Sequence, residues 1–407
     1  MDFLIDPIGF ITRWFVALLA TWGLPPGTID LVSSVVGSFI LATSALIFVI
    51  FLIWVERKII GRIQDRFGPN RVGPWGIFQS FADMFKIFTK EYITPRGADR
   101  IPFNLAPVLA VGSVLMVWAV IPFSVSVYGA DLNVAVLYIV AVGTLGELAV
   151  VLAGWGSNNK FALVAAFRAV AQLISYEVPL VLSLILPVMF AGSMGLQAIV
   201  HAQGVWFIFL APVAALVFFT ASTAEVGRAP FDLMEAESEL VSGFNIEYSG
   251  LKFGMFYVAD FLHAFTISLL FAVLFLGGWN GPGAEQFPIL GFVYFILKAS
   301  LVYFLNILLR GSLPRFRIDQ MMDLNWKVLT PISLVLLAVT ALVYKLIPAG
   351  MVFLQVVALL AANAVVVVAA DWIMRRSMAR KPRPVVAPVP RPVARAEQLP
   401  THNDAGG

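Results

Sequence analysis

The chain has 407 residues, of which 60% are hydrophobic and 13% are charged, and its formal net charge is +3. A mean hydropathy of +0.90 excludes a soluble domain with a polar surface and indicates a polytopic membrane protein. The small net charge without a basic patch excludes nucleic acid as a partner. The lack of cysteine excludes disulfides, thiolate-held iron–sulfur clusters and cysteine zinc sites on this chain.

Residues 1–27 predict an interfacial helix, because they are apolar except for a narrow polar stripe at helical spacing and end at Pro25-Pro26-Gly27. The rest of the chain predicts an all-α polytopic membrane protein, since a membrane span needs roughly 20 mostly apolar residues. The sequence contains about nine such stretches. They are residues 31–55, 105–127, 132–154, 174–194, 205–224, 254–279, 287–309, 328–347 and 351–374.

Lysine and arginine gather in alternate loops and in the C-terminal tail. Because cytoplasmic loops carry an excess of these residues, the pattern predicts an N-terminus outside and a C-terminus in the cytoplasm. The expected organisation is an eight-helix core at 28–348, an additional transmembrane helix at 349–376 and a disordered, proline-rich basic tail at 377–407. The cytoplasmic loops of the core are then residues 56–104, 155–173, 225–253 and 310–327.

The first cytoplasmic loop contains an amphipathic stretch. Apolar side chains recur at helical spacing over residues 77–88, opposite Asp83, Lys86 and Lys90. This pattern predicts a helix that lies on the membrane surface.

The third cytoplasmic loop carries the highest concentration of acid in the chain. Like charges at such close spacing repel one another, so a simple connection between two helices does not account for them. The alternative is local: Pro230 suits a first helical turn, Asp232 and Glu235 have the spacing of a capping box, and the remaining acids are solvated. The acids are Glu225, Asp232, Glu235, Glu237, Glu239 and Glu247, against the one nearby cation Arg228.

Several charged residues fall inside predicted spans, where each costs roughly 2.5–3.5 kcal/mol on insertion scales. One interpretation pairs them as structural salt bridges. The other is a buried chain of acids that carries protons from the cytoplasmic loop toward the middle of the membrane. The residues are Glu147, Glu177, Asp260 and Lys298, with Glu56 and Glu225 at the inner ends of two spans.

Ordered motifs over residues 46–330 resemble one membrane subunit of proton-translocating NADH:quinone oxidoreductase, respiratory complex I: the subunit designated H, or mitochondrial subunit 1. The acidic loop is the most specific of them. The motifs are Glu56-Arg57-Lys58, Gly68-Pro69-Asn70-Arg71-Val72-Gly73-Pro74, Phe81-Ala82-Asp83, Ala169-Val170-Ala171-Gln172, Ile174-Ser175-Tyr176-Glu177, Ala224-Glu225-Val226-Gly227-Arg228-Ala229-Pro230-Phe231-Asp232 and Pro314-Arg315-Phe316-Arg317.

The resemblance implies a membrane subunit whose cytoplasmic loops form a chamber for a long-tailed quinone such as ubiquinone. It implies hydrophilic partner subunits, one of which holds the terminal iron–sulfur cluster, while FMN and NADH bind to other subunits. It also implies small membrane subunits and antiporter-like membrane subunits as neighbours in the lipid bilayer of the cell (inner) membrane. No redox cofactor or metal is expected on this chain.

The resemblance also implies roles for individual residues. The proton path and coupling would use Glu56, Glu147, Glu177, Glu225, Glu235, Glu237, Glu239, Glu247, Asp260 and Lys298. The quinone chamber would use Asp83, Lys86, Arg228, Phe231, Asp232, Tyr248, Arg310, Arg315, Arg317 and Asp319.

The sequence departs from the family pattern at three places. Thr144 stands where some relatives have an acid, one turn before Glu147; Asp260 replaces a more usual glutamate; and Ile318 replaces a more common tyrosine. Two alternatives stay open: a proton-coupled secondary transporter, and the equivalent subunit of a ferredoxin- or hydrogenase-linked complex.

Overall fold

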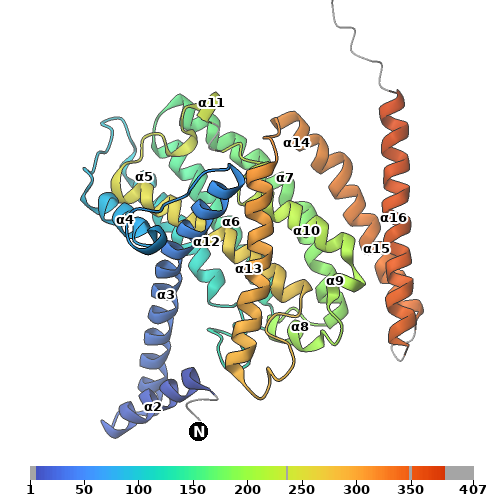
Figure 1. Ribbon diagram of the computed structural model, residues 1–407, viewed down its shortest axis with the longest axis horizontal. Coiled ribbons are helices and arrows are strands. Elements are labelled where there is room, and N and C mark those ends of the chain that lie inside the picture. Colours follow the sequence, from blue (N-terminus) through green and yellow to red (C-terminus); the bar gives the residue numbers. More distant parts are fainter. Residues whose placement is uncertain (1–5, 235–236, 348–350, 381–407) are drawn as a thin grey trace, which may run out of the picture.

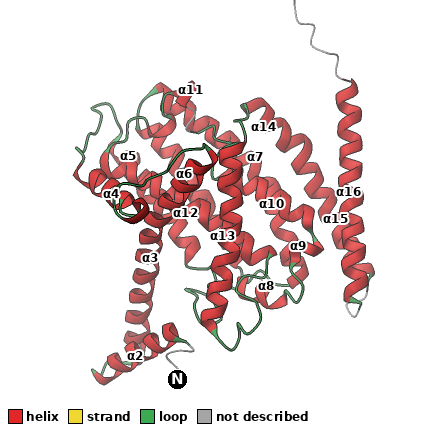
Figure 2. Cartoon of the chain, viewed as in Figure 1, coloured by secondary structure: helices red, strands yellow, loops and turns green. Residues whose placement is uncertain are grey.

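The structure is a computed structural model that describes residues 6–234, 237–347 and 351–380. The described chain is a bundle of helices joined by loops and contains no strand (Figure 1, Figure 2). This confirms the predicted all-α class. The predicted tail lies almost wholly outside the described residues, because the structure describes only residues 377–380 of it, as the end of the last helix.

The elements follow in chain order. The long helices are α3 (Pro26–Ile63), α5 (Arg100–Trp118), α6 (Ala135–Gly156), α7 (Lys160–Ala191), α12 (Gly250–Phe275), α13 (Pro288–Ser312), α15 (Thr330–Leu346) and α16 (Val352–Arg380). The shorter elements are α2 (Pro7–Thr21), η1 (Pro74–Gly76), α4 (Gln79–Thr89), α8 (Leu196–Ala202), α9 (Phe207–Leu210), α10 (Pro212–Glu225), α11 (Glu237–Leu240), η2 (Gly243–Asn245), α14 (Ile318–Leu324) and η3 (Asn325–Leu329).

Eight helices within the described ranges are long and apolar enough to cross a membrane, with α14, η3 and α15 counted as one. The predicted span at 205–224 is instead divided into α9 and α10, and Ala211 between them is non-helical (φ −139°, ψ 66°). Pro212 explains the break, because proline has no backbone N–H and its ring clashes with a preceding helical turn. The same proline is favourable at the first position of α10.

Two helices extend further into the loops predicted to be cytoplasmic than the sequence indicated. Helix α3 continues to Ile63 through charged residues that were assigned to the loop. Helix α7 begins at Lys160 because the Asn159 side chain caps it, accepting a hydrogen bond of 3.0 Å from the Phe161 N–H. These extensions place Glu56 and Gln172 on helical backbone.

The two predicted surface helices are also present as helices. In α2, Asp6 is the N-cap and accepts from the Gly9 N–H at 3.1 Å. Helix α4 presents a row of exposed aromatic side chains that includes Phe81, Phe85 and Phe88. The contact of both helices with the membrane surface stays a prediction. In Figure 1, α11 and α14 lie at one end of the bundle and α8 at the other.

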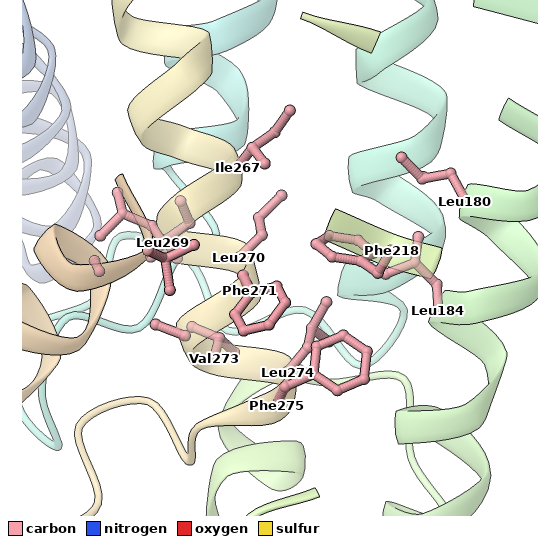
Figure 3. Close-up of a cluster of buried hydrophobic side chains, with 14 of the residues drawn as sticks. Leu180, Leu184, Phe218, Ile267, Leu269, Leu270, Phe271, Val273, Leu274 and Phe275 are labelled. Atoms are coloured by element: carbon pink, nitrogen blue, oxygen red, sulfur yellow. The ribbon is translucent and has the colours of Figure 1, made fainter. Parts of the chain in front are cut away.

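Helix α12 forms the centre of the bundle. Its most apolar stretch is 83% buried, against 17% for those of α3 and α16. Figure 3 shows Ile267, Leu270 and Leu274 of α12 in one cluster with Leu180 and Leu184 of α7 and with Phe218 of α10. A helix that is apolar all round and buried on all sides is a core helix, whereas α3 and α16 have apolar surfaces suited to lipid.

A close approach of two glycines fixes the inner end of α3 against the loop that follows it. A Cβ on Gly61 would lie 2.8 Å from the Gly68 nitrogen, and a Cβ on Gly68 would lie 2.8 Å from the Arg57 carbonyl oxygen. Both contacts are with backbone, which cannot rotate away. We therefore expect Gly68→Ala to destabilise the protein by about 1–3 kcal/mol, the usual cost of overpacking.

The measurement is the midpoint of thermal unfolding of the detergent-solubilised protein. Gly37→Ala is the control, because Gly37 lies on α3 and a Cβ there meets nothing within 4 Å. An equal midpoint for the two variants would contradict the steric argument.

Candidate functional site

Four charged side chains from distant parts of the chain meet at the inner end of α3. Glu56, buried on α3, accepts a hydrogen bond of 2.6 Å from Arg228 and one of 3.0 Å from the Tyr303 hydroxyl of α13. Arg310 of α13 contacts the other oxygen of Glu56. Arg228 also reaches Asp260 of α12 at 3.2 Å. Two acids and two cations thus form a closed cluster, which we call the Glu56 cluster.

Arg228 is the centre of this cluster. Burial alone lowers the pKa of its guanidinium, but the carboxylates of Asp260 and Glu56 raise that pKa well above its ordinary value. The guanidinium also lies 4.8 Å from the centre of the Phe261 ring, a favourable cation–π contact. Arg228 therefore stays charged, and the cluster is electrically balanced in a site where an unpaired charge would be costly.

A cavity of about 130 Å³ adjoins the Glu56 cluster, and we call it the acid cavity. Its polar lining side chains come from helices α5, α6, α10, α12 and α13 and from the loop after α10. The cavity is large enough for several water molecules, since one needs about 10–15 Å³ on this measure. The charged and titratable lining residues are Glu147, Glu225, Arg228, Asp232, Asp260, His263 and Arg310.

Small residues allow the carboxylates of the acid cavity to approach α6. A Cβ on Gly143 would lie 3.4 Å from a Glu225 carboxylate oxygen, and Glu147 is one helical turn further along α6. Glu177 of α7 does not line the cavity but interacts electrostatically with both Glu147 and Glu225. Three of the predicted acids therefore share one region, although no cation is found in an ion pair with any of them in the described chain.

The start of the acidic loop is held by hydrogen bonds to neighbouring elements. The fully buried Gln172 amide of α7 donates to the Ala224 carbonyl at 2.7 Å and to the Phe231 carbonyl at 2.9 Å. The Phe316 N–H donates to the Pro230 carbonyl at 3.0 Å. Asp232 pairs with Arg315 at 2.7 Å. The loop is thereby fixed between α7 and the segment before α14.

The short helix suggested by Pro230 and by the capping-box spacing of Asp232 and Glu235 is not found at that place. Residues 226–234 are non-helical, and the helix α11 begins only at Glu237. The competing interactions of the Asp232 carboxylate and the Phe231 carbonyl account for the difference, because they bind partners outside the loop. Glu235 and the side chain of Glu237 lie outside the described residues.

The remaining loop acids face the surface of α7. Glu239 forms an ion pair of 2.6 Å with Arg168, and its side chain is 48% exposed. Glu247 accepts a hydrogen bond of 2.6 Å from Asn159. Neither residue lines the acid cavity, so the structure divides the predicted acids into an inner group and an outer group.

The predicted chamber residues are spread over several loops and the helices next to them. The Tyr248 hydroxyl donates to the Phe103 carbonyl at 3.1 Å, and burial raises the pKa of this phenol, so it stays protonated. Phe231 packs between the rings of Tyr176 and Phe316. Asp83 pairs with Arg57 at 2.5 Å beside α3, away from the Glu56 cluster. The other three predicted chamber residues are placed by their helices. Lys86 lies on α4, Arg317 is the N-cap of α14, and Asp319 lies in the first turn of α14.

Lys298 lies apart from the acids. Its ammonium group donates to the carbonyls of Gly278 at 2.9 Å and Asn280 at 2.8 Å, and it lies 5.1 Å from the centre of the Trp206 ring. No carboxylate pairs with it among the residues that the structure describes. Lys298 thus binds backbone carbonyls of the loop that follows α12.

Three residues of the site were not assigned to it from the sequence. Gln172 lies in a family motif, Tyr303 is two turns before Arg310 on α13, and His263 is one turn after Asp260 on α12. Helical spacing to the predicted charges was a usable signal for Tyr303 and His263. For Gln172 only the position within the motif pointed to a role.

Comparison of the sequence with known proteins places this chain in a family. The sequence profile of the family described as NADH dehydrogenase matches residues 36–341. A relative from Dehalococcoides mccartyi (strain CBDB1) is 47% identical over 293 residues, which cover 72% of this chain and 82% of the relative. A relative from Geobacillus sp. (strain WCH70) is 47% identical and one from Anoxybacillus flavithermus (strain DSM 21510 / WK1) is 49% identical, each over 305 residues that cover 74% of this chain. These matches cover 91% and 90% of the two relatives, and all three relatives are named as the NADH-quinone oxidoreductase subunit designated H. The chain belongs to the NADH dehydrogenase family, among the proteins that carry this subunit name.

Proposed function

We propose that this chain forms the quinone access chamber of a complex I-type NADH:quinone oxidoreductase and couples quinone reduction to proton translocation through its buried carboxylates. Family membership makes the chain a multi-pass subunit of such a translocating oxidoreductase in the cell (inner) membrane. The chamber and the coupling path are the parts that we infer from the geometry.

The observation that carries the proposal is the contact between the Glu56 cluster and the acid cavity. Arg228 and Asp260 belong to both, and Glu147 and Glu225 line the cavity from two other helices. A change of charge near Arg228 therefore acts on carboxyl groups inside the bundle over a short distance. Such interactions are strong where water is scarce.

Quinone reduction supplies such a change of charge, because a quinone takes up two electrons and two protons to become a quinol. Protons drawn from loop acids would leave new carboxylates near the Glu56 cluster, and these would shift the protonation of Glu147, Glu225 and Glu177. The energies of the two processes are similar in size. A pKa shift of one unit is worth about 1.4 kcal/mol, and moving one charge through a membrane potential of 100 mV requires about 2.3 kcal/mol. Shifts of a few units in the pKa values of these carboxyl groups would therefore suffice to move a proton.

The quinone chamber would lie on the cytoplasmic side of this region. The Arg315–Asp232 ion pair would stand at its wall, and the buried ring of Phe231, packed against Phe316, would support that wall from behind. The exposed aromatic face of α4 suits the apolar tail of a quinone at the membrane surface. The other proposed chamber residues are Asp83, Lys86, Tyr248, Arg310, Arg317 and Asp319.

The redox cofactors belong to other subunits of the complex. We infer hydrophilic partners on the cytoplasmic loops, with the terminal iron–sulfur cluster on one of them and with FMN and NADH further away. The carboxylate path would continue into small membrane subunits and antiporter-like membrane subunits.

The test is affinity purification of the tagged chain from its native membrane, followed by identification of the subunits that come with it. We expect iron–sulfur subunits and inhibitor-sensitive NADH:quinone activity in the purified complex. A stable chain that comes alone, without this activity, would refute the proposal.

A further inference from the structure

His263 stands at the junction of two cavities. It lines the acid cavity, and it also lines a second cavity of about 50 Å³ deeper in the bundle. Glu225, Gly143 and Val117 line both cavities as well. The carboxyl group of Glu225 and the imidazole of His263 are therefore the two proton-binding groups at this junction.

One face of α12 connects the two cavities. Asp260, His263, Thr266, Leu270 and Leu274 follow at spacings of three to four residues, which places them on the same side of the helix. Asp260 lies at the acid cavity, and the last three line the second cavity. The second cavity thus runs along α12 from the acids toward the end of the bundle where α8 lies (Figure 1).

The second cavity is polar only at the end near His263. Besides Glu225 and His263, its polar lining residues are Ser222 and Thr266. The other end is closed by apolar side chains, of which Leu180, Leu184, Phe218, Leu270 and Leu274 are drawn in Figure 3. Water at this polar end would have the side chains of Glu225 and His263 as partners, and the cavity has room for it, whereas an apolar cavity of the same size stays dry.

The His263 ring is partly buried, and its side chain has no hydrogen-bond or ion-pair partner within the described part of the chain. A neutral imidazole carries one donor and one acceptor, so it can bind two waters or one water and one carboxyl group at once. Histidine transfers protons readily because it can take a proton on one nitrogen and release another from the second.

We propose that His263 is a proton carrier paired with Glu225 at the junction of the two cavities. In the step, the O–H bond of a protonated Glu225 breaks and an N–H bond forms on His263, directly or through one water, which gives a carboxylate and an imidazolium. The imidazolium then releases the proton from its other nitrogen to water in the second cavity. No electrons move in this exchange.

The charged groups that line the acid cavity together with His263 come from five elements. They are Glu147 of α6, Glu225 of α10, Asp260 of α12, Arg310 of α13, and Arg228 and Asp232 of the acidic loop. Carboxylates attract a positive charge at this place and guanidinium groups repel it. A proton on His263 therefore depends on the state of the same cluster that we propose responds to quinone reduction. The inference rests on that proposed function and adds one residue to it.

The experiment uses the complete complex in proteoliposomes, with His263→Gln as the main variant. Glutamine keeps hydrogen-bonding capacity but cannot relay a proton. We expect NADH-driven pumping to fall by about tenfold or more, since positioned proton carriers contribute about 10²–10⁴-fold. The KM for quinone should stay unchanged, and the profile of rate against pH should lose one ionisation. A purely structural histidine would leave the pH profile as it is.

His201→Gln is the matched control. His201 is exposed near the other end of the bundle and packs edge-on against Trp279, with ring centres 5.0 Å apart. His263→Asn is the second variant, in case the longer side chain disturbs packing. Wild-type pumping and an unchanged pH profile in either assembled variant would overturn the inference. Failure of both variants to assemble would also overturn it, because it would assign His263 a packing role.

The wild-type complex distinguishes a failure of the proposed function from a failure of the role of His263. If it shows no quinone-dependent pumping, the proposed function fails together with the inference. If it pumps and the His263 variants pump equally well, only the role of His263 fails.

Discussion

Replacing Arg228 by glutamine should prevent the accumulation of assembled protein. The variant removes the cation that binds both Glu56 and Asp260 and leaves the Glu56 cluster with an excess negative charge in a buried site. Breaking a buried ion pair from one side typically costs about 3–5 kcal/mol. Since whole domains have only about 5–15 kcal/mol of net stability, the loss is large. The measurement is the amount of subunit in membranes and its thermal midpoint in detergent.

A second substitution tests the electrostatic origin of this loss. The double variant Glu56→Gln/Arg228→Gln restores electrical balance, so it should be more stable than Arg228→Gln alone. Arg375→Gln is the control, because Arg375 and its partner Asp371 on α16 are exposed and such pairs are worth about 0.2–1 kcal/mol. Equal losses for the single and double variants would show that shape, not charge, determines the effect.

Replacing Glu225 by glutamine should have a different effect from Arg228→Gln. The complex should assemble normally but show almost no turnover. Glu225 is found in no ion pair within the described ranges, and its neighbours Glu147 and Glu177 repel it, so the neutral amide costs no stability. An amide cannot carry a proton, and loss of a positioned proton-transfer group typically lowers rates by about 10²–10⁴-fold. The measurements are inhibitor-sensitive NADH:quinone turnover and proton pumping of the purified complex.

Two further glutamate variants calibrate this result. Glu239→Gln should reduce turnover less, because Glu239 is half exposed beside Arg168 and water can replace it in a path. Glu285→Gln should leave turnover unchanged, because Glu285 lies in an exposed loop and lines neither cavity. Wild-type turnover in assembled Glu225→Gln and Glu239→Gln complexes would refute the role assigned to these acids.

The length, hydropathy and charge density of each segment could be read from the sequence. The lengths of apolar stretches predicted eight helices that the structure contains, and the density of acid in residues 225–250 identified the loop at the site. Even the break at Ala211 has a local cause in Pro212, but the hydropathy of 205–224 outweighed it in the prediction. Bilayer thickness makes length and hydropathy decisive for such stretches.

The partners of the charged side chains could not be read in this way. Glu56 and Arg228 are 172 residues apart in sequence and meet only because α3, α12 and α13 pack together. Lys298 was grouped with the acids because it lies in a predicted span, yet its ammonium group binds the carbonyls after α12. Local composition was enough to predict most of the long helices and which residues carry charge. The packing of the bundle sets which of these charges neutralise one another and which line a cavity, because Coulomb energy depends on distance and burial.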